Sequence, residues 1–290
     1  MNLNKLTRRN LLLIAGCGLT ISPKAQAQNI LPGSTIWVWS DCILSETKLK
    51  EFSDTYNIKT LFLFVTPQSA RALIRKNELA LSRVKALHAE NRRIYAVCGE
   101  PEWSWGNTAL AEHARLLVDL TKTSTLFDGL HFDVEPQALP EWNNPQLRRK
   151  LIKGTLSFFK FVRDATPDIE IDIAVNPIFN TLQFDSSSFL KEMTHYANSF
   201  SIMSYRSNID KAINWARPSI IEIENHLKEW RMGILISDGE PGTSWKNTPQ
   251  KIFSHKMKEL DRRLVEEFGS RLYRGIAYHD YDALLPKIEN

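Results

Sequence analysis

Short runs of apolar, β-branched and aromatic residues recur along the chain from residue 35 onward. Most are followed by a longer stretch in which apolar residues repeat at spacings of three and four. The strand-like runs lie at 35–39, 59–65, 93–98, 129–134, 170–175, 199–203, 232–236 and 275–278. The helical stretches lie at 69–90, 110–122, 145–163, 220–230 and 249–268. Strands that alternate with helices predict a parallel sheet with helical crossovers.

The segment after the first run decides between an open and a closed sheet. An open, doubly wound sheet usually carries a glycine-rich phosphate loop there, but residues 39–42 (WSDC) contain no glycine. A closed barrel typically needs about 250 residues, and 263 of the 290 residues follow position 27. The sequence therefore predicts an α/β fold, a single-domain (β/α)8 TIM barrel over 28–290, with functional groups at the carboxyl ends of its strands.

The first 27 residues differ from the rest. A basic start precedes an apolar stretch at 11–21 and an Ala-x-Ala pattern that ends at Ala27, which is typical of a secretory signal. The apolar stretch is shorter than the ~20 residues of a membrane span, and residues 7–12 (TRRNLL) resemble a twin-arginine export signal. We expect cleavage after Ala27 and a periplasmic or secreted protein without a membrane span.

The net charge of +4 belongs to this segment. The chain has 37 Lys and Arg against 33 Asp and Glu, and residues 1–27 hold four of the basic residues and none of the acidic ones. The remaining 33 basic and 33 acidic residues balance. A neutral barrel gives no electrostatic reason to expect nucleic acid or an anionic membrane as a partner.

The three cysteines allow alternative interpretations. Cys17 follows Ile-Ala-Gly and could be a lipid-anchor site, but only three apolar residues, 11–13, separate that sequence from Asn10, so an ordinary signal is favoured. Cys42 and Cys98 could pair in an oxidising compartment or simply pack in the core.

The stretch 127–136 (FDGLHFDVEP), which contains the fourth run, carries the most chemical information. Alternation along a strand puts His131, Asp133 and Glu135 on the face opposite Leu130 and Phe132. Such a row could be a polar network that only fills the barrel, but Glu135 lies at the strand end, before a proline and a loop. Two neighbouring carboxyls in a semi-enclosed site cannot both ionise easily, so one pKa is raised. Glu135, the outermost, is the predicted general acid.

These residues resemble a known family. Residues 128–135 are similar to the Asp-Gly-x-Asp-x-Asp-x-Glu strand of the family 18 glycoside hydrolases, the chitinase and endo-N-acetylglucosaminidase group. Residues 202–205 (IMSY) resemble that family's Met-x-Tyr on the sixth strand, and 275–278 (GIAY) take the place of its eighth strand. The resemblance implies a retaining mechanism assisted by the substrate's acetamido group, with Glu135 as acid and base and with Asp133 and Tyr205 orienting that group.

Three positions depart from the family pattern. His131 replaces the middle aspartate, Arg206 follows the tyrosine in place of Asp or Asn, and Tyr278 stands where tryptophan is usual. We expect these three residues in the substrate site, and their differences from the family leave open a substrate other than chitin.

Further carboxylates follow the third and seventh runs. Glu240 would be the nucleophile if the barrel used two enzyme carboxylates ~5 to 5.5 Å apart; a plain turn residue is the alternative. Glu100 is a candidate ligand for sugar hydroxyls. Asn176, His279 and Asp280 also follow strand runs and are expected to point at the mouth, with Asn176 as a candidate substrate ligand.

Tryptophans follow several of the strand runs. Sugar rings stack on indole faces, so we expect a binding groove at the barrel mouth lined by several of Trp39, Trp103, Trp105, Trp142 and Trp245. Trp37, Trp215 and Trp230 are expected in the core.

The favoured function is an exported glycoside hydrolase that acts on an amino-sugar-containing or related polysaccharide, as a monomer without a cofactor. A non-catalytic carbohydrate-binding barrel is the main alternative. A metal-dependent hydrolase using His131, Asp133 and Glu135 is a third, but these positions are awkwardly spaced for one ion and no His-x-His pattern occurs.

Overall fold

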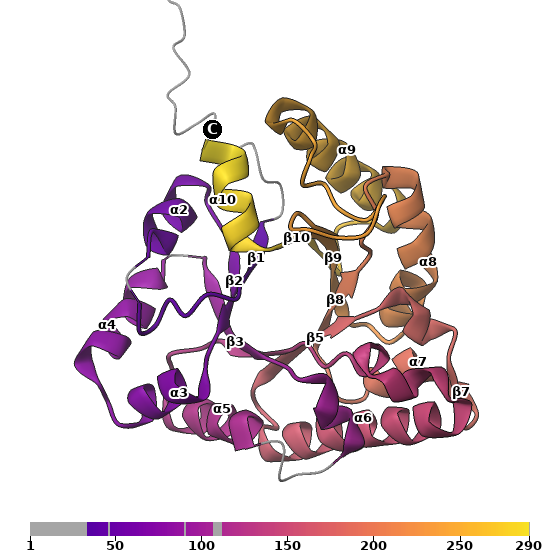
Figure 1. Cartoon of the computed structure of the whole chain (residues 1–290), viewed down its shortest axis with the longest axis horizontal. Coiled ribbons are helices and arrows are strands. Elements are labelled where there is room, and N and C mark those ends of the chain that lie inside the picture. The colour runs from indigo at the N-terminus through magenta and orange to yellow at the C-terminus, as the bar shows by residue number, and fades with distance from the viewer. Residues whose placement is uncertain (1–33, 46, 90, 107–111, 290) are drawn as a thin grey trace, which may run out of the picture.

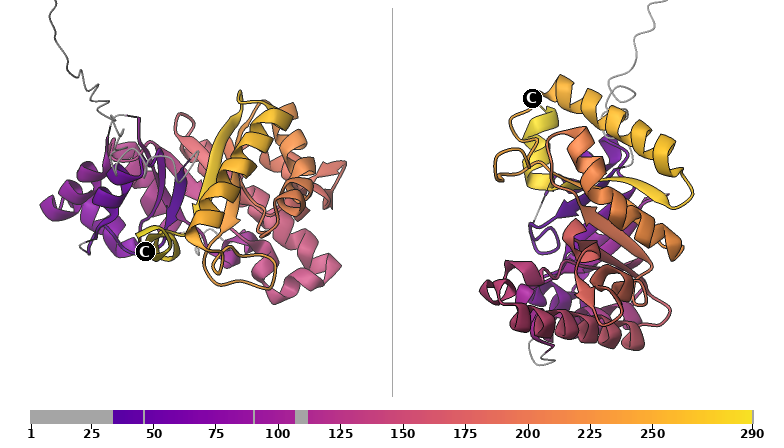
Figure 2. Two further views of the ribbon diagram at one scale, coloured as in Figure 1. Left: turned by 90° about the horizontal axis from the view of Figure 1, so that it is seen from above. Right: turned by 90° about the vertical axis from the view of Figure 1, so that its right-hand side faces the viewer.

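The computed structural model describes residues 34–45, 47–89, 91–106 and 112–289. Within them, eight parallel strands form a closed barrel, and helices surround it as an outer ring (Figure 1). Figure 2 shows from two other sides that helices cover the strands. The predicted (β/α)8 barrel is confirmed. The expected signal at 1–27 and Cys17 lie outside the described residues.

The barrel strands follow the predicted runs closely. They are β1 (Thr35–Val38), β2 (Thr60–Phe64), β3 (Arg93–Cys98), β4 (Gly129–Phe132), β5 (Glu170–Val175), β8 (Ser199–Met203), β9 (Glu229–Leu235) and β10 (Tyr273–His279). Their order around the barrel is β1-β10-β9-β8-β5-β4-β3-β2, and a separate antiparallel pair joins β6 (Gln183–Phe184) to β7 (Ser187–Ser188). Pairing of Thr35 with Ala277 closes the barrel.

The connections contain α-helices and short 3-10 helices. The α-helices are α2 (Leu49–Thr55), α3 (Pro67–Ile74), α4 (Glu78–Leu87), α5 (Glu112–Thr123), α6 (Pro145–Ala165), α7 (Phe189–Met193), α8 (Ile209–Asn225), α9 (Gln250–Phe268) and α10 (Tyr281–Glu289). The 3-10 helices are η1 (Pro101–Trp105), η2 (Pro136–Ala138), η3 (Pro140–Asn143) and η4 (Pro177–Asn180). In Figure 1 the yellow α10 packs beside the indigo β1, where the ring closes.

Two predicted helices have different limits in the structure. The stretch 69–90 is split into α3 and α4 because Lys76 adopts a positive φ of 58° and the Asn77 side chain caps α4 by accepting from the Ala80 N–H. Of the stretch 220–230, residues 220–225 belong to a helix that begins earlier, at Ile209, where Asn208 caps α8 through the Lys211 N–H, whereas Glu229 and Trp230 begin β9. Local capping chemistry, not apolar periodicity, sets both boundaries.

Side chains of each barrel strand alternate between the interior and the helices. Trp37, Phe62, Tyr95, Val97 and Ala277 form an interior cluster separate from the large core under the helices. Burial on both faces explains why the strands read as nearly continuous apolar runs. Polar interior positions therefore stand out, and they gather on β4, β5, β8 and β9.

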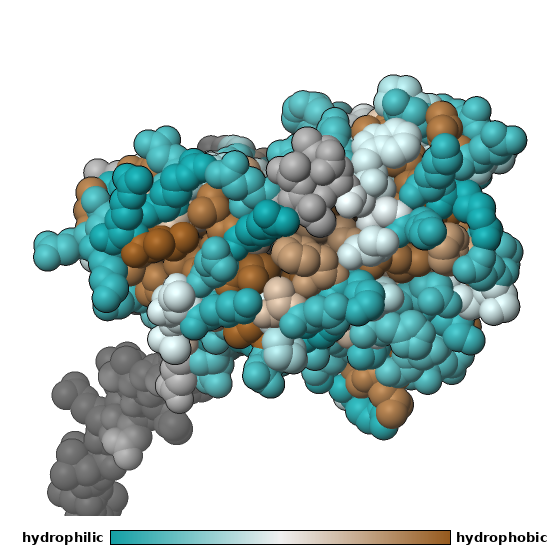
Figure 3. Space-filling view, turned by 90° about the horizontal axis from the view of Figure 1, so that it is seen from below, coloured by the Kyte–Doolittle hydropathy of each residue, from teal (hydrophilic) through white to brown (hydrophobic). Residues whose placement is uncertain are grey.

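The outer surface is mostly polar. Figure 3 shows one side on which hydrophilic side chains dominate and apolar residues reach the surface in smaller patches. Within the described ranges, no helix combines the length and apolar content that crossing a membrane requires.

Candidate active site

The carboxyl end of β4 presents two acidic side chains close to the end of β3. The Asp133 N–H donates to the Cys98 carbonyl at 3.0 Å, which extends the pairing of the two strands. Gly99 then runs so close that a Cβ there would lie 2.0 Å from the Asp133 carbonyl oxygen. Only glycine allows this approach, and it fixes the backbone from which the acidic side chains project.

Asp133 and Glu135 are two neighbouring carboxyls, and the charge of Glu135 acts on Asp133. Burial raises the pKa of Asp133 well above its usual range, and the charge of Glu135 adds to this effect. Burial also raises the pKa of Glu135, which a hydrogen bond from Gln137 Nε2 to Glu135 Oε2 at 2.5 Å partly opposes. Two carboxyls in this environment favour a state with one proton between them.

Tyr205 follows β8, close enough for the charges of both carboxyls to act on its phenol. Burial raises the pKa of its phenol well above the ordinary value, and the charges of Asp133, Glu135 and Asp280 raise it further. The hydroxyl therefore stays protonated as a donor. The structure thus brings together Asp133, Glu135 and Tyr205, the three residues that the sequence assigned to catalysis.

His279, the last residue of β10, completes this end of the barrel. Its ring centroid lies 5.8 Å from that of Tyr205, and its Nε2 accepts a hydrogen bond from Trp39 Nε1 at 2.9 Å. Burial lowers the pKa of the His279 imidazole. Asp133 Oδ1 and His279 Nδ1 are both buried and have no hydrogen-bond partner among the described residues, so polar atoms in the mouth remain available to a ligand.

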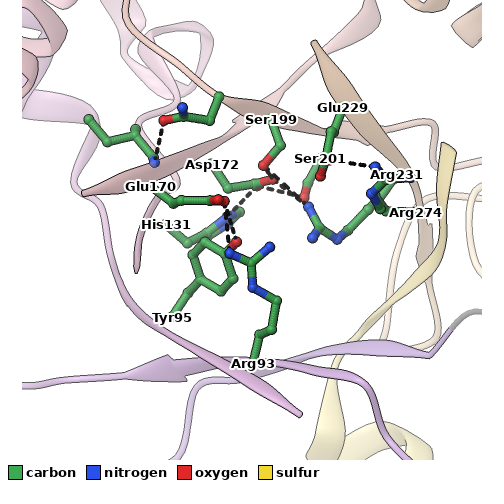
Figure 4. A network of polar contacts seen from close by, with 12 residues as sticks. Arg93, Tyr95, His131, Glu170, Asp172, Ser199, Ser201, Glu229, Arg231 and Arg274 are labelled. Atoms are coloured by element: carbon green, nitrogen blue, oxygen red, sulfur yellow. Dashed lines mark hydrogen bonds and ion pairs between the residues drawn. The ribbon is translucent and has the colours of Figure 1, made fainter. Parts of the chain in front are cut away.

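A polar network fills the barrel below the mouth (Figure 4). Asp172 lies at its centre: its carboxylate contacts His131 Nδ1 at 2.7 Å and Arg231 at 2.7 Å, and accepts from Ser199 and Ser201. Burial alone would raise the pKa of Asp172, but the charge of Arg231, together with His131 and Ser199, lowers it to about 2. The interior therefore holds an ionised, compensated carboxylate.

His131 belongs to this network and not to the mouth. Its ring is fully buried, Trp37 Nε1 donates to its Nε2 at 2.9 Å, and its Nδ1 faces Asp172. Both ring nitrogens are therefore engaged, and the assignment of His131 to substrate binding is wrong. For this residue, the alternative of an internal network is correct.

Tyr278 also departs from expectation. It is fully buried in the core under the helices, with its ring 6.3 Å from that of Phe253 on α9. Strand alternation puts the adjacent residues Ala277 and His279 on the interior side, so Tyr278 faces outward. Its predicted place in the sugar site is wrong, and His279 takes the position at the mouth.

Most of the predicted tryptophan groove is absent from the mouth. Trp103 and Trp142 are 3% and 9% exposed and pack in the outer core, Trp103 on Phe158 and Trp142 on Phe179. Trp245 is likewise buried. The short 3-10 helices after β3 and β4 turn the first two indoles back onto α6 and η4. Trp39 packs against the interior cluster at the mouth, and Trp105 is 39% exposed.

The remaining predicted substrate ligands lie near strand ends and differ in their exposure and in their contacts. Glu100 is exposed at the start of η1, and Glu240 is exposed in the loop after β9. Asn176 uses its side-chain oxygen to cap η4 through the Ile178 N–H. Arg206 stacks on Trp215 with its guanidinium carbon 3.4 Å from the ring centroid. Burial lowers the pKa of the Arg206 guanidinium, and the negative charge of Glu240 partly opposes this effect.

A surface hollow of about 690 Å³ adjoins this region, between the loop after β9 and α10. The Ile236 N–H in its wall donates to the His279 carbonyl at 2.7 Å. Asp238 and Lys246 form an ion pair of 2.6 Å in the same wall.

The two cysteines that the structure describes are free. Cys42 and Cys98 are each buried as thiols, which matches simple packing. Across the described ranges, no group of three His, Cys, Asp or Glu side chains is arranged to hold a metal ion.

Gln137, Asp172 and Arg231 were not singled out from the sequence. Asp172 and Arg231 occupy inward positions two residues into their strands, and polar residues at alternating positions of otherwise apolar runs were the available signal. Gln137 lies in η2, directly after the Glu135-Pro136 pair. Its role depends on a turn that apolar patterning does not define.

Comparisons of sequence give no match to a protein-family model and no significant match to a curated protein. Comparisons of structure find similar barrels. A chitinase from Chromobacterium violaceum matches with a TM-score of 0.53 at 13% identity, over 88% of this chain and 97% of that one. An endo-β-N-acetylglucosaminidase from Cordyceps militaris matches with a TM-score of 0.52 at 17% identity, over 85% and 79%.

A protein of different chemistry is equally similar. A Toxoplasma gondii protein described as a deoxyribose-phosphate aldolase matches with a TM-score of 0.54 at 11% identity, over 93% of this chain and 97% of that one. This chain spans 63% of the length of a catalytic domain from an Ostrinia furnacalis chitinase. The likenesses to the Chromobacterium violaceum and Cordyceps militaris structures show that this chain shares the barrel fold of a chitinase and of an endo-β-N-acetylglucosaminidase, at low sequence identity.

Proposed function

We propose that the protein is a glycoside hydrolase that acts on an amino-sugar-containing or related polysaccharide. The observation that carries this proposal is the half-buried pair of Asp133 and Glu135 after β4, whose charges both act on the Tyr205 phenol after β8. The fold shared with chitinases and an endo-β-N-acetylglucosaminidase supports it. The aldolase likeness shows that the fold alone does not select a reaction.

In the first step, protonated Glu135 gives its proton to the glycosidic oxygen. The bond from the anomeric carbon to that oxygen breaks, and the leaving sugar departs as an alcohol. The carbonyl oxygen of the substrate's own 2-acetamido group forms the new bond to the anomeric carbon, which gives a cyclic oxazolinium ion.

In the second step, the Glu135 carboxylate accepts a proton from a water molecule. The water oxygen attacks the anomeric carbon from the face that the leaving group vacated, the oxazolinium ring opens, and the sugar retains its configuration. Glu135 thus alternates between acid and base, which requires a pKa near the working pH. Burial shifts its pKa in that direction.

Asp133 and Tyr205 act on the acetamido group. Asp133 Oδ1, which has no hydrogen-bond partner in the described part of the chain, would accept from the amide N–H. The Tyr205 hydroxyl, kept protonated by its raised pKa, would donate to the amide oxygen. Together they would hold the amide in line for attack.

Glu240 fits the nucleophile role less well. Its side chain is exposed in the loop after β9, and its charge acts on Arg206. In contrast, the carboxyl that interacts electrostatically with Glu135 is that of Asp133. The substrate-assisted scheme therefore matches the described geometry better than a two-carboxylate scheme.

A non-catalytic carbohydrate-binding barrel is the second candidate. The observation that favours it is His131, whose two nitrogens are committed to Trp37 and Asp172 and cannot exchange a proton with the mouth. This candidate predicts saccharide binding without any Glu135-dependent product.

The test is a comparison of substrates with the purified protein. Tetrasaccharides of N-acetylglucosamine, of glucosamine and of glucose would be incubated separately, and products would be identified by mass spectrometry. We expect cleavage of the N-acetylated chain, no cleavage of the deacetylated chain, and cleavage retained in Glu240→Gln. Binding of the N-acetylated chain without product would favour the second candidate, and neither binding nor product would overturn the assignment to this substrate class.

We also infer export through the signal at 1–27. In a bacterial host, the full chain should appear in the periplasmic fraction or the medium with Gln28 as its first residue. Replacing Arg8 and Arg9 together by Lys should retain it in the cytoplasm if the twin-arginine route is used. An N-terminus that begins with lipid-modified Cys17 would contradict this inference.

A further inference from the structure

Two tryptophans on the interior side of β1 and its continuation make the same contact with two different histidines. Trp37 Nε1 donates to His131 Nε2 at 2.9 Å, and Trp39 Nε1 donates to His279 Nε2 at 2.9 Å. The indole N–H is a donor only. Each histidine must therefore present an unprotonated Nε2, and its proton must lie on Nδ1.

The lower pair is complete. The Nδ1–H of His131 meets Asp172 Oδ1 at 2.7 Å, so both nitrogens have partners. The ring is fully buried and stacked on Phe62 with centroids 3.8 Å apart. Nothing in this pair requires a ligand.

The upper pair is incomplete. His279 Nδ1 is buried but has no hydrogen-bond partner among residues 34–45, 47–89, 91–106 and 112–289. The nearest carboxylate, Asp280 Oδ2, is 3.9 Å away, beyond hydrogen-bond range, while Asp280 Oδ1 accepts from the Ala283 N–H at the start of α10. A buried donor without a partner is costly, and strand ends in this fold are where ligands bind.

We propose that His279 is a further substrate-binding residue, whose Nδ1–H donates a hydrogen bond to an oxygen of the sugar held beside Tyr205. Its ring lies 5.8 Å from the Tyr205 ring, on the side of the mouth opposite to the carboxyl pair's own strand. Trp39 is the positioning residue, because its indole fixes which nitrogen carries the proton. This inference rests on the proposed function, since it assumes a saccharide in the mouth.

Two substitutions separate the ligand role from a structural role. Counted in bonds from Cβ, the Asn side-chain nitrogen matches His Nδ1, whereas the terminal atoms of Gln match His Nε2. His279→Asn can therefore keep a donor toward the sugar and lose the contact with Trp39. His279→Gln can keep an acceptor for Trp39 and lose the donor toward the sugar.

Binding would be measured by calorimetric titration in a Glu135→Gln background, with the tetrasaccharides of N-acetylglucosamine and of glucose as probes. We expect affinity for a bound tetrasaccharide to fall ~10-fold in His279→Gln and by a smaller factor in His279→Asn. A ¹⁵N spectrum of the free protein should show His279 protonated at Nδ1, and that signal should move when the tetrasaccharide binds.

The other outcomes overturn the inference. The reverse order, with His279→Asn weaker than His279→Gln, would show that the histidine serves only to hold Trp39. Equal affinity in all three proteins would remove His279 from the site while leaving the proposed function intact. Failure of the Glu135→Gln protein to bind either tetrasaccharide would count against the proposed substrate class, and the His279 inference would fall with it.

Discussion

Gln137 Nε2 donates a hydrogen bond to Glu135 Oε2 across 2.5 Å, two residues along the chain. The other atom of the same amide, Gln137 Oε1, is buried without a hydrogen-bond partner in the described part of the chain. The contact stabilises the ionised form of Glu135 and lowers its pKa against the effect of burial. Gln137 is therefore a positioning residue for the proposed acid and base.

Replacing Gln137 by Leu should move the pH profile of activity. Because the variant loses the donor that lowers the Glu135 pKa, that pKa should rise. A general acid works only while it is protonated, so the alkaline limb of kcat/KM should shift to higher pH. The maximal rate should fall several-fold as the carboxyl loses its fixed orientation.

The control for this change is Gln68→Leu, an exposed position on α3. Its pH profile should match that of the unsubstituted protein. A Gln137→Leu profile whose alkaline limb stays in place, or moves to lower pH, would contradict the role given to Gln137.

The two tyrosines that the sequence placed in the site should behave differently. Tyr205→Phe removes the phenol that lies against Asp133 and Glu135, and we expect kcat to fall ~10²- to 10³-fold, as for loss of one polarising donor. Tyr278→Phe changes a buried side chain that faces the helices and should leave kcat/KM within about twofold. Initial rates on the N-acetylglucosamine tetrasaccharide test both substitutions. Equal losses of activity in the two variants would contradict the placement of Tyr278 outside the site.

Gly99→Ala should damage the site through the backbone. The added methyl would lie 2.0 Å from the Asp133 carbonyl oxygen, so the ends of β3 and β4 must separate. We expect a loss of about 1 to 3 kcal/mol in the free energy of unfolding, as for other overpacked positions, with a fall in activity larger than the stability change explains. Denaturant unfolding and rates below the unfolding transition measure the two effects. Unchanged activity would mean that this backbone does not position Asp133.

Asp172→Asn should destabilise the barrel. The substitution leaves the buried Arg231 without its carboxylate, and removal of one partner of a buried pair typically costs about 3 to 5 kcal/mol. Asp185→Asn is a matched control, because that carboxylate pairs with Arg149 at an exposed site and should cost less than about 0.5 kcal/mol. Equal losses in urea unfolding would contradict the central place of Asp172.

The same carboxylate predicts how stability depends on pH. The pKa of Asp172 is lowered to about 2 in the folded protein, against about 3.9 for an unfolded chain. Its stabilising contribution is therefore fully present above about pH 4 and is lost as the pH falls toward 2. In Asp172→Asn this part of the acid dependence should disappear, which unfolding curves between pH 2 and 6 would show.

The barrel was predictable because burial on both faces leaves each strand as an apolar run between amphipathic helices. The position of Asp133 and Glu135 after β4 was also predictable, since alternation puts both on the same side as His131, whereas Tyr205 was predicted from the family resemblance. Tyr278 was expected in the site only because 275–278 resemble the family's eighth strand; alternation along β10 makes its neighbour His279 the inward residue.

The direction in which a tryptophan after a strand points could not be predicted from the local sequence. Trp103 and Trp142 follow strands, as residues at the mouth should, yet short 3-10 helices turn them into the outer core. Such turns depend on tertiary packing, including Gly154 of α6, where a Cβ would lie 2.0 Å from the Ser104 carbonyl oxygen. Position in the chain relative to a strand does not reveal that packing.

The most direct measurement is the rate of product formation from the N-acetylglucosamine tetrasaccharide by the purified protein and by Glu135→Gln. Because Glu135 is proposed to supply and remove the proton in both steps, the variant should lose ~10²- to 10⁴-fold in kcat while keeping its melting temperature and its affinity for the tetrasaccharide. A Glu135→Gln protein that forms product at the same rate as the unsubstituted protein would contradict the assignment of Glu135 as the acid and base.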